Sequence, residues 1–122
     1  MTRLKQIDHV QIGVADIDAA SAAWGRLLGR ETSWRGSHPT QGTSNALFRI
    51  DNTYIELIAG GRFLTQRIEN DGEGITGLFF ACNDIDAYVA GARTHVPSIE
   101  SRLGRGEDAS GHERRWRSAH IM

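Results

Sequence analysis

The sequence predicts an α+β fold made of two related modules, each beginning with a strand and then a helix. The first evidence is an internal repeat. Residues 7–20 and 75–88 align without a gap at an offset of 68, with five identities in fourteen positions. Repetition at a fixed period indicates two copies of one supersecondary unit. The second is the alternation of apolar and polar residues in several short segments, which is typical of strands with one buried face.

The first strand is expected at residues 7–14. Every second residue from Val10 is apolar, so this face should pack against a helix. His9 and Gln11 share the opposite, polar face. The side chain of His9 is therefore expected on the side of the sheet away from the helix.

The first helix is expected from Asp16 to about Leu28. Aspartate is a favoured N-cap because its carboxylate accepts a backbone N–H of the first turn. Gly29 is placed to end the helix, since glycine adopts the left-handed conformation of a helix C-terminus at little cost. The apolar stripe of this helix comprises Ile17, Ala20, Trp24, Leu27 and Leu28.

Three further strands complete the first module. They are expected at residues 30–36, 45–50 and 54–59, with a loop at 37–42. Asp51 and Asn52 form a turn signal between the last two strands. Glu56 alternates with Ile55 and Leu57, so it should also face away from the helix.

The second copy is shorter than the first. Its helix should start at Asp84 and end near His95, followed by strands at 98–103 and 114–121 with a polar, mobile loop at 104–111 between them. No fourth strand is expected, so the edge at 114–121 should be exposed. An exposed edge invites pairing with another chain, and we therefore expect a homodimer, with or without strand exchange.

The domain organisation follows from these elements. We expect a first βαβββ module at residues 1–60, a connector at 61–74 with a short helical turn at 63–68, and a second, truncated βαββ module at 75–122. Together they should form one compact domain, because 122 residues are enough to bury a core without covalent staples.

Composition excludes several classes of function. The formal charge of −1 and the lack of a basic stripe or known motif argue against nucleic-acid binding. One cysteine, Cys82, excludes an internal disulfide. From its first residues we expect no signal peptide, and no apolar run has membrane length, so we expect a cytoplasmic protein that is not bound to a membrane. Phosphate-binding glycine loops and nucleophile elbows are also absent.

Several weak signals in the right order resemble the glyoxalase-like, or vicinal oxygen chelate, superfamily, and within it the glyoxalase-like domain branch. The segments that carry the resemblance are Ile7–Val10, Asp16–Ala20, Trp24–Gly29, His38–Leu47 and Tyr54–Leu57. The resemblance implies paired βαβββ modules whose mixed sheet curls around a cleft for a small molecule. It also implies that a histidine of the first strand and a glutamate of the fourth bind a divalent metal.

Carried over to this chain, those metal ligands are His9 and Glu56, which would suit Zn, Mn, Fe, Co or Ni. The second module has Gly77 in place of the matching histidine, so the sequence offers half of a site. A second copy of the chain could complete the site. Alternatively, His38, His112 or His120 could substitute, although His38 is expected in a turn, or the protein could use no metal.

Other cleft residues are expected from the same alternation. Asn45 and Arg49 share a strand face, Phe79 lies on the face of Gly77, and Arg114 and Trp116 share a face of the last strand. The aromatic rings could stack on a planar ligand, and the arginines could bind a carboxylate or phosphate. Ordinary core packing of the aromatics and surface exposure of the arginines are the competing interpretations.

Three functions remain open from the sequence. The first is a metal-dependent lyase, isomerase or dioxygenase, with Glu56 or Glu69 as the catalytic base. The second is a metal-free protein that binds or sequesters a small molecule. The third is a truncated assembly module without a ligand.

Overall fold

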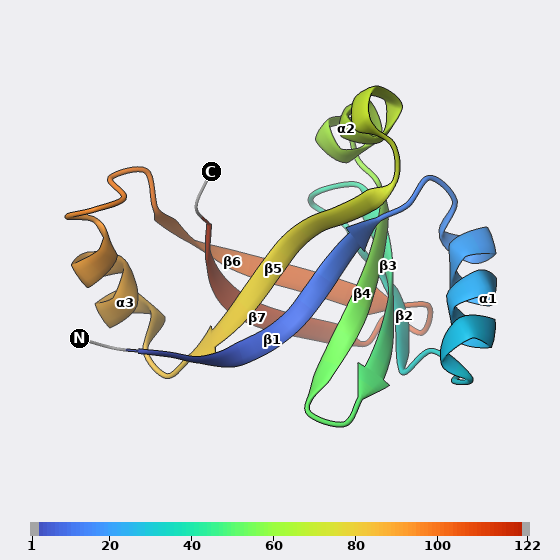
Figure 1. Ribbon diagram of the computed structural model, residues 1–122, viewed down its shortest axis with the longest axis horizontal. Coiled ribbons are helices and arrows are strands. Elements are labelled where there is room, and N and C mark those ends of the chain that lie inside the picture. Colours follow the sequence, from blue (N-terminus) through green and yellow to red (C-terminus); the bar gives the residue numbers. More distant parts are fainter. Residues whose placement is uncertain (1–2, 121–122) are drawn as a thin grey trace.

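A computed structural model describes residues 3–120 and contains seven strands and three helices (Figure 1). The elements in chain order are β1 (Leu4–Gly13), α1 (Ile17–Leu28), β2 (Trp34–His38), β3 (Thr43–Ile50), β4 (Thr53–Gly60), α2 (Arg62–Asp71), β5 (Gly74–Cys82), α3 (Ile85–Ala92), β6 (Glu100–Asp108) and β7 (Glu113–His120).

All of these strands form one mixed sheet in the order β5-β1-β4-β3-β2-β6-β7. β1 and β4 are parallel, and every other pair is antiparallel. The sheet curls so that its two ends approach each other. The ring of Phe79 on β5 lies 6.5 Å from the ring of His120 on β7, and β6 and β7 pass behind β1 and β5 in Figure 1. The predicted α+β fold with a curled mixed sheet is confirmed.

Helix α1 covers the outer face of β3 and β4. A side-chain oxygen of Asp16 accepts the backbone N–H groups of Asp18 and Ala19 at 3.0 and 3.1 Å, and Gly29 ends the helix at φ 64°. Both ends agree with the sequence prediction. The core between α1 and the sheet is built from Val14, Ala46, Phe48, Leu57 and Ala59. Because successive side chains of a strand point to opposite faces, the polar residues between these apolar ones on β1, β3 and β4 point toward the inside of the curl.

The other two helices differ from their predicted limits. Helix α2 extends beyond the short turn expected at 63–68. Helix α3 begins after the Asp84 cap, as expected, but ends at Ala92 rather than near His95, because the carbonyl of Ala92 accepts the turn N–H groups of both His95 and Val96. In the described part of the chain, no helix is long and apolar enough to cross a membrane.

The predicted limits of β2 were wrong. The strand was expected at 30–36 with His38 in the following loop, whereas it runs from Trp34 to His38. The backbone N–H of Arg30 still bonds the carbonyl of Gly25 at the end of α1, so the chain leaves the helix late. The first hydrogen bond to β3 is donated by the backbone N–H of Ser33 to the carbonyl of Leu47, at 2.8 Å, and the paired strand follows from Trp34.

The predicted loop at 104–111 was also wrong, because β6 continues to Asp108. Gly104 and Gly106 lie under the indole of Trp116 on the paired strand, and a Cβ on Gly104 would overlap that ring. These glycines therefore mark the close approach of an aromatic ring rather than a loop. The last strand, expected at 114–121, is observed as Glu113–His120, and Ile121 lies outside the described residues.

Candidate functional site

A buried carboxylate forms the centre of a polar cluster on the inner face of the curl. Gln11 Nε2 donates to Glu56 Oε1 at 3.1 Å, and Asn45 Nδ2 donates to Glu56 Oε2 at 3.0 Å. His9 Nε2 lies 3.3 Å from Oε1, and His38 Nε2 lies 3.9 Å from Oε2. Strands β1, β2, β3 and β4 each contribute to this cluster, so four neighbouring strands converge on one carboxylate.

The electrostatics of the cluster favour an ionised Glu56. Burial alone would raise the pKa of Glu56, but hydrogen bonds from His9, Asn45 and Gln11 hold that pKa below its ordinary value. Burial alone would lower the pKa of His9, but hydrogen bonds and charge from Glu56 and Asp8 raise that pKa above its ordinary value. The two groups therefore stabilise each other as an ion pair.

The ring of His9 is fixed on every side. It stacks between the rings of Tyr54 and Phe79, with centroids 4.4 and 4.1 Å away and planes 11° apart in both cases. His9 Nδ1 lies 2.7 Å from Asp8 Oδ2. The register of β1 against β5 shifts between Ile7 and His9, which is a β-bulge at Asp8. The bulge brings two consecutive polar residues of β1, Asp8 and His9, to the site.

His38 is a site residue that the sequence prediction placed in a turn. It lies buried at the end of β2, with Nδ1 2.7 Å from the hydroxyl oxygen of Thr43 and its ring edge-on to Trp116 at 5.7 Å. Burial lowers the pKa of His38, against the opposing charge of Glu56. Trp34 and His38 are four residues apart and lie on the same face of β2. This spacing could have indicated the position of His38, but the predicted strand ended at residue 36.

The structure brings the predicted arginines to the same inner surface. The guanidinium of Arg49 lies over the ring of Tyr54, 5.3 Å from its centroid, and that of Arg114 lies over Trp34 at 4.2 Å. A cavity of about 410 Å³ opens between these side chains. It is lined by Asp8, Ser33, Leu47, Arg49, Tyr54 and Arg114.

Other sequence candidates lie away from the cluster. Glu69 is exposed on α2, and His112 is exposed in the turn after β6, where it binds Asp108. His120 reaches the edge of Phe79 but not Glu56.

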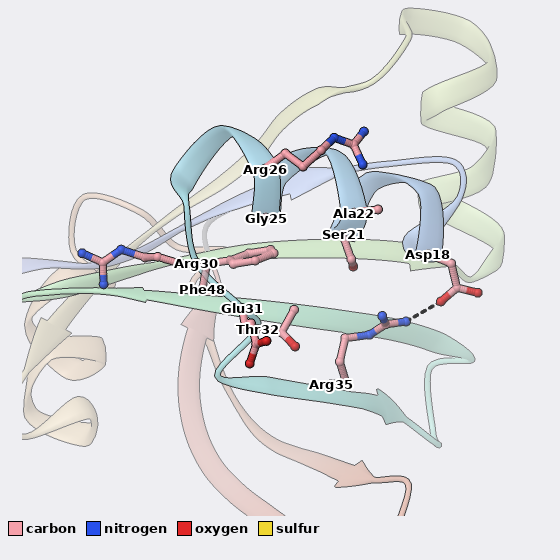
Figure 2. Close-up of a pocket in the computed structure, with 10 residues that line it drawn as sticks. All are labelled: Asp18, Ser21, Ala22, Gly25, Arg26, Arg30, Glu31, Thr32, Arg35 and Phe48. Carbon is pink, nitrogen blue, oxygen red and sulfur yellow. Dashed lines mark hydrogen bonds and ion pairs between the residues drawn. The ribbon is translucent and has the colours of Figure 1, made fainter.

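A larger cavity, of about 570 Å³, lies on the opposite face of the sheet. Figure 2 shows it between α1 and β2, with Phe48 in its wall and the ion pair between Arg35 and Asp18 (2.6 Å) joining the two elements. The sheet separates this groove from Glu56, so we assign the site to the inner face.

The sequence from residue 7 to 122 matches the family model described as "Glyoxalase-like domain". This chain belongs to the glyoxalase-like domain family. The resemblance to the vicinal oxygen chelate superfamily is thereby confirmed, and the curled sheet around an inner polar site is the expected arrangement.

Relatives of this glyoxalase-like protein include epimerases. The chain is 29% identical over 110 residues to ethylmalonyl-CoA/methylmalonyl-CoA epimerase of Cereibacter sphaeroides, covering 87% of this chain and 80% of the relative. Among solved structures, Streptomyces coelicolor methylmalonyl-CoA epimerase with 2-nitronate-propionyl-CoA superposes with a TM-score of 0.74 at 23% identity, covering 94% and 97% of the two chains. The Mycobacterium tuberculosis methylmalonyl-CoA epimerase gives 0.71 at 24% identity, covering 92% and 86%. These structural matches show a shared fold.

The His9–Glu56 pair of the glyoxalase-like protein has the spacing of two metal ligands. Two atoms that each lie about 2.1 Å from one ion are about 3.0–3.4 Å apart, and His9 Nε2 lies 3.3 Å from Glu56 Oε1. His38 approaches the other carboxylate oxygen, so the two imidazoles do not converge on one point. Within residues 3–120, no three His, Cys, Asp or Glu side chains are arranged to hold an ion. The pair therefore fits two positions of a metal site.

One acceptor in the cluster has no donor. Asn45 Oδ1 is buried and makes no hydrogen bond, while its amide nitrogen is bound to Glu56. Turning the amide over would place its oxygen against the carboxylate, so the observed orientation is the favourable one. A buried acceptor without a donor is costly, and a cation or a ligand N–H or O–H beside it would remove that cost.

Proposed function

We propose that this glyoxalase-like protein is an isomerase-class enzyme that moves a proton at the carbon next to a carbonyl group of a small molecule. The observation that carries the proposal is the convergence of two imidazoles and two amides on the buried carboxylate of Glu56. This places proton-transfer groups and charge-stabilising groups within one cleft. The epimerase among the relatives of the chain supports the same reaction class.

The two histidines suit different roles. His38 is buried with a lowered pKa, so it is neutral near pH 7. In the tautomer whose Nδ1–H donates to Thr43, Nε2 is free to take a proton. His9 is held by carboxylates at both ring nitrogens and is the fixed partner of Glu56. Glu56 stays ionised, and its catalytic role is to hold positive charge in the cleft through its own negative charge.

A divalent metal would be held by His9 Nε2 and Glu56 Oε1 and would stabilise negative charge on the carbonyl oxygen of the substrate. The remaining ligand positions would fall to substrate oxygens, solvent or a second copy of the chain. The amide of Asn45 orients the Glu56 carboxylate, and its free oxygen would contact the bound group.

The test of this proposal is exchange of a carbon-bound proton for deuterium, followed by NMR in D₂O. Methylmalonyl-CoA and ethylmalonyl-CoA are the probes, and the protein is loaded in turn with Zn, Mn, Co, Ni or Fe(II). We expect exchange in the wild type and a loss of about a hundredfold or more in Glu56→Gln and His38→Gln. His95→Gln is the matched control, because His95 is exposed and outside the cleft.

Two results would contradict the proposal. One is the absence of exchange with either probe under every metal. The other is exchange that survives in both the Glu56→Gln and the His38→Gln variants at the rate of the His95→Gln control.

The aromatic lining supports a second candidate, a metal-free protein that binds a small molecule. Phe79 stacks on His9, and Trp116 meets His38 edge-on, so flat apolar walls flank the cluster. Elemental analysis separates the two candidates. Stoichiometric metal that is lost in His9→Ala favours the enzyme, whereas metal-free protein that still binds planar ligands favours the binding protein.

We also propose that the protein is a homodimer. The sheet of the described residues ends at β5 and β7, which leaves two strand edges without a partner. Leu78 and Phe80 of β5 pair with Val10 and Ile7 of β1 and point outward, because the intervening Phe79 points inward onto His9. This outer face is partly exposed and apolar, and no helix lies in front of it in Figure 1.

A further inference from the structure

Two arginines from distant parts of the chain meet in the cavity beside the His9–Glu56 cluster. Arg49 comes from β3 and Arg114 from β7, and both line the same space of about 410 Å³. In the sheet order, β2 and β6 separate these strands, so the curl of the sheet is what brings the two side chains together.

Neither guanidinium is neutralised by a carboxylate among residues 3–120. Each is instead held over an aromatic face, Arg49 over Tyr54 and Arg114 over Trp34. A cation–π contact fixes the position of a guanidinium and leaves its positive charge in place. Both arginines therefore keep their N–H donors free for an anion.

One carboxylate, that of Asp8, also contributes to the charge of the cavity. Asp8 lies in the same wall, and its carboxylate is also bound to His9 Nδ1 at 2.7 Å. Two guanidinium groups and one carboxylate leave a formal excess of one positive charge. A ligand group with a single negative charge would balance it, whereas a phosphate group would overcompensate.

Tyr54 connects this cavity to the reaction site. One side of the cavity is formed by Tyr54, which also stacks on His9 with ring centroids 4.4 Å apart. Tyr54 therefore belongs both to the wall of the cavity and to the stack that holds His9.

We propose that the cavity between Arg49 and Arg114 binds the carboxylate of a small organic acid that is the substrate of the neighbouring His9–Glu56 cluster. This inference rests on the proposed function and names its substrate class. The planar fork of a guanidinium matches a carboxylate with two parallel hydrogen bonds. Arg49 and Arg114 are then the residues that select an acid over its neutral analogue.

The test is direct binding to chelator-treated protein, so that it does not depend on turnover. The probes are levulinate, its neutral amide and inorganic phosphate, with binding followed by calorimetry and by tryptophan fluorescence, since Trp34 lies beside Arg114. We expect saturable binding of levulinate and binding of the amide that is weaker by about tenfold or more. Phosphate should bind more weakly than levulinate.

Variants assign the effect to the cavity. Arg49→Gln and Arg114→Gln should each weaken levulinate binding about tenfold or more, since each removes charge-assisted hydrogen bonds. Arg115→Gln is the matched control, because Arg115 is the next residue on β7 but pairs with Glu113 outside the cavity. Thermal melts of all three variants check that they remain folded.

Three results would overturn the inference: no saturable levulinate binding, equal weakening by Arg115→Gln, or tighter binding of phosphate than of levulinate. Glu56→Gln should abolish exchange, whereas Arg49→Gln and Arg114→Gln report on levulinate binding, so separate variants test the proposed function and the present inference. A wild type that catalyses exchange without binding levulinate refutes only the present inference. A wild type that binds levulinate but catalyses no exchange refutes only the proposed function.

Discussion

His9 shows how a single residue joins packing to chemistry. Two rings clamp its faces, and carboxylates face both of its nitrogens. The imidazole therefore cannot rotate without losing several contacts at once, and its charged form is favoured. A side chain held this firmly is preorganised for a ligand that approaches Glu56.

The His9–Glu56 pair predicts a pH-dependent stability in chelator-treated protein. Folding raises the pKa of His9 above its ordinary value of 6.5, so its contribution is complete below pH 6.5 and is lost as pH rises through the raised pKa. His9→Gln should lower the free energy of unfolding by about 2 kcal/mol below pH 6.5, and by less at alkaline pH.

Urea denaturation of the wild type and His9→Gln across this range measures the difference. Taking the difference between the two proteins largely cancels the titration of His38, whose pKa shifts in the opposite direction. In the wild type, Glu56 stays ionised across this range, because its pKa is held below its ordinary value of 4.5. A difference that grows with pH would show that His9 is not bound as the charged form.

Among the elements, the hairpin of β6 and β7 packs against β2 through the ring of Trp116. Trp116 lies across Gly104 of the paired strand, and its edge faces His38 of β2. The hairpin made by β6 and β7 is thereby packed against the inner site, with the single β2–β6 contact region at Gly36 and Ser37 as its backbone link.

Gly104→Ala tests this packing. The added methyl would overlap the indole of Trp116, so we expect a loss of about 1–3 kcal/mol in urea denaturation. Gly74→Ala is the matched control, since Gly74 is also in a strand and has open space at its Cβ position. Equal effects of the two substitutions would mean that the indole does not lie against Gly104.

At the scale of the whole molecule, the helices cover the outer face of the sheet unequally. Helix α1 packs on the outer face of β3 and β4, whereas α3 contacts β6 and β7 and leaves β5 uncovered. The uncovered outer face of β1 and β5 presents Leu4, Ile7, Leu78 and Phe80. An apolar face next to a free strand edge is typical of a surface that associates.

Sedimentation equilibrium tests the proposed dimer. The wild type should sediment as a dimer, and Leu78→Ser combined with Phe80→Ser should shift it toward monomer, because the substitutions remove apolar contact area. Leu27→Ser on α1 changes a leucine that is also exposed but lies on another face, and should leave the dimer intact. A wild type that stays monomeric at the highest soluble concentration contradicts the proposal.

The sequence by itself determined the local elements and the faces of their strands. Alternation placed His9 and Glu56 on one side of the sheet, and Asp16 and Gly29 defined α1, because these signals depend only on neighbouring residues. The repeat at residues 7 and 75 and the family resemblance predicted the fold class for the same reason, since both are patterns along the chain.

Only the tertiary structure decided which distant side chains meet. The position of His38 depends on where β2 begins to pair with β3, and the bulge that delivers Asp8 depends on the register of β1 against β5. The meeting of Arg49 and Arg114 depends on the curl of the whole sheet. Long-range pairing and curvature are set by many weak contacts at once, and no local pattern in the sequence specifies them.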